Sequence, residues 1–168
     1  MAMSMYNASV PLFKTLLGAL SNVLDKGQQF AKAKGIEESV LVNARLAPDM
    51  FALARQVQIA TDQAKGGVAR LAGLEVPAYD DNETTFDQLK ARVAKTLAFI
   101  DSVKAAQIDG SENKEITLKM RSGDVKYTGQ RYLIGSVIPN FTFHCSTAYN
   151  ILRHNGVEVG KRDFLGNF

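Results

Sequence analysis

The sequence predicts an all-α fold: a four-helix bundle with a short β-hairpin between its third and fourth helices. Along four long segments, apolar residues recur three and four positions apart, which is the spacing of a helix with one buried face. Between the third and fourth segments the spacing changes to alternation around Ser122-Gly123, as in a hairpin. With 168 residues the chain is long enough to bury one core, and we expect residues 1–168 to form a single domain.

The first two long helices begin at residue types that favour helix initiation. Ser9 is a candidate N-cap for the first, whose apolar stripe predicts a helix as far as Lys34. A turn or two of helix is expected within residues 36–46. The second long helix is predicted to open at Pro48, because proline suits a first turn and Asp49 suits the positive end of the helix dipole.

An extended connection separates the second helix from the third. Residues 74–84 lose the helical spacing, and a connection of this length lets the chain cross over the end of the bundle. Thr85 and Gln88 then have the spacing of a capping box, which predicts the start of the third helix.

The hairpin and an interrupted helix complete the chain. Alternation on both sides of Ser122-Gly123 predicts strands within residues 115–128. Because an isolated hairpin is marginally stable in water, we expect it to lie against the helices. The fourth helix is predicted from about Arg131, and Pro139 predicts a kink or break near residues 136–138.

Composition and charge narrow the functional classes. Hydrophobic residues make up 46% of the chain and charged residues 22%, which is typical of a globular protein and not of a disordered one. The net charge is +3 and the basic residues are scattered, so we expect no nucleic-acid partner. No apolar run is long enough to span a membrane, and the first residues lack the features of a secretory signal. Since a single cysteine forms no internal disulfide, the sequence predicts a cytoplasmic protein with no membrane partner.

His144 is the leading candidate for a functional side chain. It falls on the core-facing stripe of the fourth helix, where an apolar residue is expected, and Asn140 lies one turn earlier on the same face. One interpretation is a hydrogen-bonded core histidine, and the other is a ligand or general base at the end of a central cavity. Because it replaces an apolar residue, we predict that His144 is largely buried and hydrogen-bonded.

Other polar residues also have a structural and a functional interpretation. In the structural interpretation, Asp49 interacts favourably with the dipole of the second helix and Asp62 is a solvated charge. In the functional one, either carboxylate completes a site with His144, and Asp49 is the better candidate because it neighbours the start of the core stripe. Cys145 is either a small buried apolar residue or a reactive thiol. His154 lies in the last helical turn, where a positive charge favours the helix dipole.

Several stretches of the chain resemble one protein family. They are Leu-Ala-Pro-Asp-Met-Phe around Pro48, Gln-Val-Gln around Val57, Pro-Asn-Phe-Thr-Phe-His ending at His144, and the C-terminal run from Ile151 to Gly166. Together they are similar to an uncharacterised bacterial domain of unknown function within the DinB-like, or YfiT-like, superfamily. The resemblance covers nearly the whole chain and implies an up-down-down-up bundle that forms a homodimer.

The resemblance also bears on metal binding. Many members of the superfamily hold a divalent metal with three histidines, one on the second helix and an H-x-x-x-H pair on the fourth. Here the pair is Asn140-x-x-x-His144 and the second helix has no histidine, so two of the three ligands are missing. An amide oxygen is a poor substitute for imidazole at a nickel- or zinc-type site. His144 therefore stays a metal candidate for an ion that is at most weakly held, and superfamily catalysis is not carried over.

Three functions follow as hypotheses. The first is a small central pocket, lined by Asn140 and His144, that binds a small molecule or a weakly held metal. The second is metal-dependent thiol transfer at a rebuilt site of His144, Asp49 or another carboxylate, and water. The third is a non-catalytic structural or interaction module in which His144 is a core residue.

A homodimer has a physical rationale besides the resemblance. Leu16 and Val23 widen the apolar arc of the first helix, and Phe99 widens that of the third, beyond what one packing seam requires. A two-fold contact would cover such a patch on both subunits. The alternative is that the hairpin or the C-terminal segment around Phe164 covers these residues within one chain.

Overall fold

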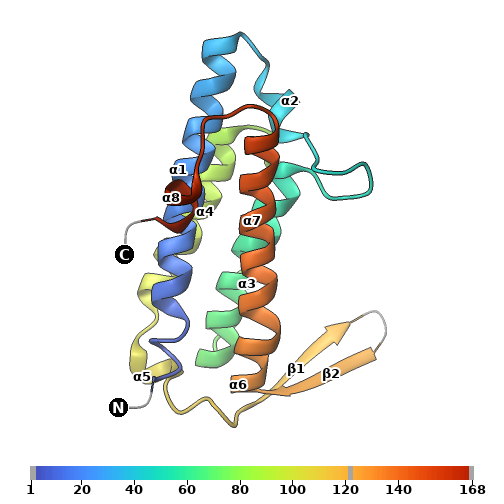
Figure 1. Ribbon diagram of the computed structural model, residues 1–168. Coiled ribbons are helices and arrows are strands. Elements are labelled where there is room, and N and C mark those ends of the chain that lie inside the picture. The colour runs from blue at the N-terminus through green and yellow to red at the C-terminus, as the bar shows by residue number, and fades with distance from the viewer. Residues whose placement is uncertain (1–2, 121–122, 167–168) are drawn as a thin grey trace.

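Long helices dominate the computed structural model, which describes residues 3–120 and 123–166. They are α1 (Val10–Lys34), α3 (Leu53–Ala72), α4 (Phe86–Ser102) and α7 (Ile138–His154). Strands β1 (Glu115–Met120) and β2 (Gly123–Thr128) form an antiparallel hairpin between α4 and α7. Figure 1 shows the long helices side by side, with the hairpin extending away from them. The fold is therefore mostly helical with a small two-stranded sheet, as the sequence predicts.

Short elements join or follow the long ones. They are α2 (Glu38–Val42), α5 (Ala105–Ile108), α6 (Gly129–Tyr132), the π-helical η1 (Leu133–Val137) and α8 (Lys161–Leu165). The predicted irregularity near residues 136–138 is confirmed by η1, which runs continuously into α7. Pro139 lacks a backbone N–H, and in a regular α-helix its ring would meet the carbonyl four residues earlier, so a wider turn at this point relieves the conflict.

The start of α3 differs from the prediction. The helix opens at Leu53 and not at Pro48. The backbone N–H of Met50 donates to the carbonyl of Ala47 at 3.0 Å, so Pro48 occupies the second position of a turn. Proline suits that position as well as it suits a first helical turn, which is why the sequence pattern was misleading. Asp49 consequently lies in the turn and not at a helix N-terminus.

The core forms where the apolar faces of the long helices meet. Helix α1 packs against α4 and α7, and α3 packs against the same two helices. Phe13 of α1 and Phe141 of α7 meet edge to face, with ring centroids 5.0 Å apart, and both rings are fully buried. The connection before α4 returns the chain to the end of α1, because the backbone N–H of Phe86 donates to Glu38 of α2 at 3.0 Å. None of the described helices is both long enough and apolar enough to cross a membrane.

The capping box and the hairpin are both confirmed. The Thr85 hydroxyl accepts from the backbone N–H of Gln88 at 3.3 Å, and the Gln88 side chain accepts from the backbone N–H of Thr85 at 3.2 Å. The strands pair in register from Glu115 opposite Thr128 outward. The hairpin lies against the helices, as expected: Ile116 is buried, and Leu118 and Tyr127 pack against the core. Its closest helical neighbour is α6, and its outer end extends away from the long helices (Figure 1). Ser122 of the expected turn lies outside the described residues.

The apolar arc of α1 is covered within the chain. Leu16 and Val23 are buried, and Phe164 of α8 lies beside them. Helix α8 is held there by Asp163, whose carboxylate accepts from Nζ of Lys26 at 2.7 Å. The alternative in which the C-terminal segment covers these residues is therefore the correct one for α1, and its face gives no rationale for a homodimer.

Candidate functional site

His144 is buried and hydrogen-bonded, as predicted. The residue is 9% exposed, and its Nδ1 lies 2.6 Å from Oε1 of Gln56 on α3. A second bond orients the Gln56 amide, because its Nε2 donates to the backbone carbonyl of Phe51 at 3.0 Å. Oε1 is then the acceptor toward His144, which assigns the ring proton to Nδ1. The amide thereby selects one tautomer and leaves Nε2 of His144 unprotonated.

The surroundings of His144 keep it neutral at pH 7. Burial lowers the pKa of the imidazole, and the positive charge of Arg55 lowers it further. The ring of Phe143, which is 55% exposed, meets the imidazole edge to face at 5.2 Å. These contacts are those of a hydrogen-bonded core histidine that ties α7 to α3.

The structure does not gather the other candidates around His144. Asn140 lies one turn earlier on α7 but is exposed, and the cleft that it lines does not include His144. Asp49 is exposed in the turn before α3, and the described partner of the imidazole is Gln56. Asp62 forms ion pairs with cations of α3 and α4 instead. Sequence reasoning missed Gln56: it stands in the Gln-Val-Gln stretch that supports the family resemblance, but a neutral amide carries no spacing or charge signal for its partner.

These residues do not fit the three-histidine metal site that the resemblance implies. Nδ1 of His144 is engaged by Gln56, and Asn140 faces the surface. Within residues 3–120 and 123–166, no group of three or more His, Cys, Asp and Glu side chains is arranged to hold a metal ion. Cys145 adds no ligand, since it is buried and burial raises its thiol pKa to about 12. A rebuilt site with Asp49 is not assembled either.

Asn140 opens onto a cleft between the hairpin and the helices α3 and α7. Its volume is about 540 Å³, within the roughly 300–1,000 Å³ of small-molecule sites. Most of its polar lining comes from α3, β1, η1 and α7 and consists of Gln63, Arg70, Thr117, Lys119, Ser136 and Asn140. Leu118 and Tyr132 complete the wall.

Two adjacent glycines of α3 permit close packing near this cleft. A Cβ atom at Gly67 would lie 2.7 Å from Cγ1 of Val137, so glycine permits the close approach of η1. A Cβ atom at Gly66 would lie 2.5 Å from Nη1 of Arg70, so the guanidinium rests against the helix one turn before its own residue. Sequence reasoning missed Arg70, because an arginine near a helix end is common, and the preceding Gly-Gly pair was the available signal.

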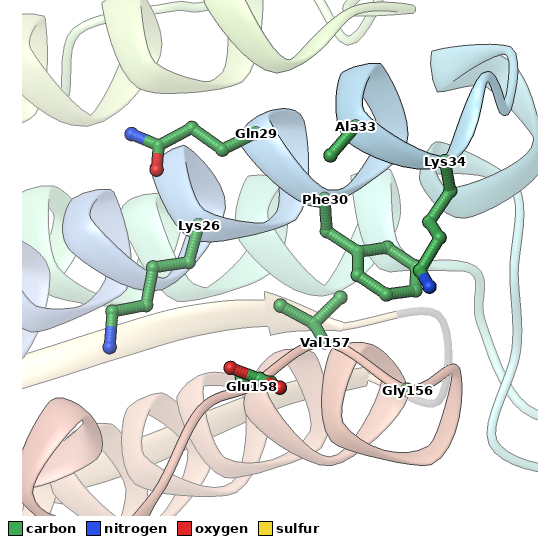
Figure 2. Close-up of a pocket in the computed structure, with 8 residues that line it drawn as sticks. All are labelled: Lys26, Gln29, Phe30, Ala33, Lys34, Gly156, Val157 and Glu158. Atoms are coloured by element: carbon green, nitrogen blue, oxygen red, sulfur yellow. The ribbon is translucent and has the colours of Figure 1, made fainter.

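A second hollow, of about 660 Å³, lies beside the C-terminal ends of α1 and α7. Figure 2 shows Phe30 and Val157 within it and charged side chains along its length. Lys26 is already engaged by Asp163 at 2.7 Å, and Glu158 brings a negative charge to the same lining as Lys34. With charges of both signs on its lining, this groove is the weaker candidate for a ligand site.

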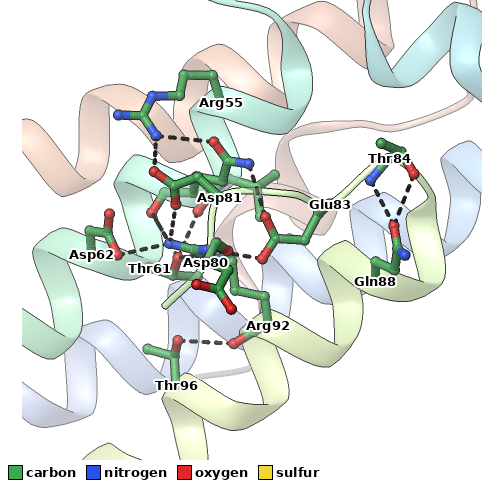
Figure 3. A network of polar contacts seen from close by, with 12 residues as sticks. Arg55, Thr61, Asp62, Asp80, Asp81, Glu83, Thr84, Gln88, Arg92 and Thr96 are labelled. Carbon is green, nitrogen blue, oxygen red and sulfur yellow. Dashed lines mark hydrogen bonds and ion pairs between the residues drawn. The ribbon is translucent and has the colours of Figure 1, made fainter. Parts of the chain in front are cut away.

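A buried ion-pair network joins α3 and α4 to the connection between them (Figure 3). The side chain of Arg92 is 2% exposed and lies 2.8 Å from Asp62, 3.1 Å from Asp81 and 2.9 Å from Glu83. Its Nε donates to the hydroxyl of Thr61 at 2.7 Å. The network holds the connection against both helices. In the sequence, Arg92 stands out only as one of several scattered basic residues.

The comparisons with known proteins agree with this arrangement of helices and hairpin. The class is DinB-like: a crystal structure of a DinB family member protein from Shewanella denitrificans matches with a TM-score of 0.91 and 44% sequence identity. The match covers 97% of this chain and 92% of that chain. The model of the family "Domain of unknown function (DUF1993)" matches residues 5–165, and the chain belongs to this family, whose function is unknown. The chain matches none of the curated proteins. The resemblance seen in the sequence is thus confirmed.

Proposed function

We propose that this protein binds a small molecule in the cleft between the hairpin and helices α3 and α7, and that it has no three-histidine metal centre. One observation carries the proposal. Gln63, Thr117, Ser136 and Asn140 line the cleft, and their side chains make no hydrogen bond with other described residues. These side chains are exposed or half-buried and bind water, which a ligand in a hollow of this size can replace.

His144 contributes to this proposal from inside the protein. Its hydrogen bond to Gln56 ties α7 to α3 one turn beyond Asn140. The His144–Gln56 hydrogen bond therefore helps to position the helix that carries Asn140. The proposed ligand site is a surface cleft that Asn140 lines, and His144 acts on it from the interior. This arrangement favours the first of the three hypotheses, in its small-molecule form.

Native mass spectrometry of untagged protein, together with a screen of small fragments, tests the proposal. Asn140→Trp fills the cleft and is expected to abolish binding, whereas Asn150→Trp, at an exposed position of the same helix, leaves binding unchanged. A wild-type protein that retains no molecule and binds no fragment contradicts the proposal. So does undiminished binding by Asn140→Trp.

The fold supports a proposal for chain topology as well. We propose the up-down-down-up order, because Phe86 at the start of α4 lies beside α2, which follows the end of α1. At the other end of the bundle, the backbone N–H of Tyr6 donates to Asp109 at 2.8 Å, which places the residues before α1 beside those after α4 and α5. An experimental structure with α3 and α4 antiparallel would contradict this order.

We also propose a homodimer, through a face other than that of α1. Phe51 and Phe143 are both 55% exposed and flank the His144–Gln56 pair, and large exposed apolar side chains favour a protein contact. Sedimentation equilibrium is expected to give about twice the monomer mass of 18.3 kDa, and Phe143→Glu is expected to return the monomer mass. A wild-type mass of one chain across a micromolar dilution series would end this proposal.

A further inference from the structure

Arg70 is a half-buried cation whose position helix capping does not explain. It stands in the last turn of α3, where a basic side chain commonly interacts with the free carbonyl groups of the helix end. Lys114 takes that role here, because its Nζ donates to the carbonyl of Leu71 at 3.1 Å. The Arg70 guanidinium instead lies back over Gly66, in the wall of the cleft. Within the described part of the chain no carboxylate lies within 4 Å of it.

Tyr132 holds this guanidinium in place. Its hydroxyl accepts a hydrogen bond from Nη1 of Arg70 at 3.0 Å, so the phenolic O–H remains free to donate. Burial raises the pKa of Tyr132 above its ordinary value, although the charge of Arg70 acts in the opposite direction, so the phenol is protonated at neutral pH. Arg70 and Tyr132 together present several donors to the cleft.

The rest of the cleft adds donors and no acid. Lys119 of β1 brings a second positive charge, and its ammonium forms no ion pair with the residues that the structure describes. Ser136 and Asn140 add a hydroxyl and an amide. No Asp or Glu stands among these lining residues, but Asp124 lies opposite Lys119 in the hairpin register. Arg70 is therefore the lining cation with no carboxylate beside it in the described part of the chain.

We infer that the cleft binds a small molecule through a dianionic oxyanion group, such as a phosphate monoester, and that Arg70 and Lys119 hold this group. The inference rests on the proposed function and names the class of its ligand. A guanidinium fork matches two oxygens of a phosphate, and a lysine ammonium adds a mobile point charge. A phosphate monoester also presents three acceptor oxygens to these donors, whereas a carboxylate presents two.

Isothermal titration calorimetry at pH 7.5 and low salt tests this with three probes of similar size: phenyl phosphate, benzoate and benzyl alcohol. Phenyl phosphate is expected to bind most tightly. Arg70→Met is expected to weaken its binding about tenfold or more, the scale of a lost charge-assisted hydrogen bond, and Arg70→Lys by less. Lys119→Met, at an exposed strand position, is also expected to weaken it, whereas Arg153→Met, exposed on α7, leaves it unchanged.

Three outcomes would overturn the inference. They are no binding of phenyl phosphate, equal binding of benzoate or benzyl alcohol, and phosphate binding that Arg70→Met and Lys119→Met leave unchanged. If neutral fragments bind as tightly as phenyl phosphate, and Asn140→Trp abolishes their binding, the ligand class is wrong and the proposed function stands. If no probe or fragment occupies the cleft, both fail.

Discussion

Replacing Arg92 with methionine removes a buried guanidinium while keeping much of the apolar stem. Three carboxylates then lose one ion pair each, but Asp62 keeps Lys65 and Asp81 keeps Arg55. The side chain of Glu83 is 10% exposed, and its remaining described partner is the Gln58 amide at 2.9 Å. Asp62 and Asp81 are 37% and 40% exposed, so water can replace much of what they lose. The cost of the substitution therefore falls mainly on Glu83.

The expected loss of stability follows from these exposures. Removing one partner of a buried ion pair costs about 3–5 kcal/mol. The lower end applies here because, of the three carboxylates, only that of Glu83 is shielded from water. We therefore expect a loss of about 3 kcal/mol in the free energy of unfolding. At about 2–4 °C per kcal/mol for a chain of this size, Tm falls by roughly 6–12 °C.

Thermal and urea unfolding followed by circular dichroism measure this loss. Arg153→Met makes the same chemical change at an exposed position of α7 and is expected to shift stability by less than about 0.5 kcal/mol. Arg92→Lys keeps the positive charge but not the planar guanidinium, so its loss of stability should lie between those of Arg153→Met and Arg92→Met. An Arg92→Met protein as stable as Arg153→Met would refute the structural role of the network.

Three further predictions concern acid stability, packing and thiol reactivity. Burial acts to raise the pKa of Asp81, but the hydrogen bond and charge of Arg55 outweigh it and hold the pKa below its ordinary value. The stabilisation from this carboxylate is therefore fully present above about pH 4 and is lost as pH falls through the folded pKa. Urea unfolding midpoints measured from about pH 6 to about pH 2 should show this loss. Gly67→Ala should lower stability by about 1–3 kcal/mol in urea unfolding, because the added Cβ meets Val137. Cys145 should react with a thiol reagent at pH 8 in urea and be inert in the folded protein, and fast labelling of the folded protein would contradict its burial.

Periodicity was sufficient for most of the helical framework. Apolar spacing located α1 and α4, and the Thr85–Gln88 capping box fixed the start of α4. Alternation located the hairpin. The start of α3 was wrong, because Pro48 satisfies a turn and a helix equally well and only the contact of Met50 with Ala47 separates them.

The polar sites were less accessible to sequence reasoning, for a physical reason. The burial of His144 was predictable because it interrupts an apolar stripe. Its partner Gln56 and the cation Arg92 depend on contacts between residues far apart in the chain, and neither leaves a periodic signal. The cleft beside Asn140 likewise brings β1 together with α3 and α7, segments that are far apart in the chain.

Fragment binding observed residue by residue in ¹H–¹⁵N NMR spectra tests most directly whether the cleft is the ligand site. Fragments with and without a phosphate group are titrated into the labelled wild-type protein and into Asn140→Trp. We predict shifts clustered at residues 63–70, 117–119 and 132–140, largest with the phosphate fragments and absent in the variant. Shifts confined to the groove of residues 26–34 and 156–158, or no shifts at all, would contradict the assignment of the cleft as the binding site.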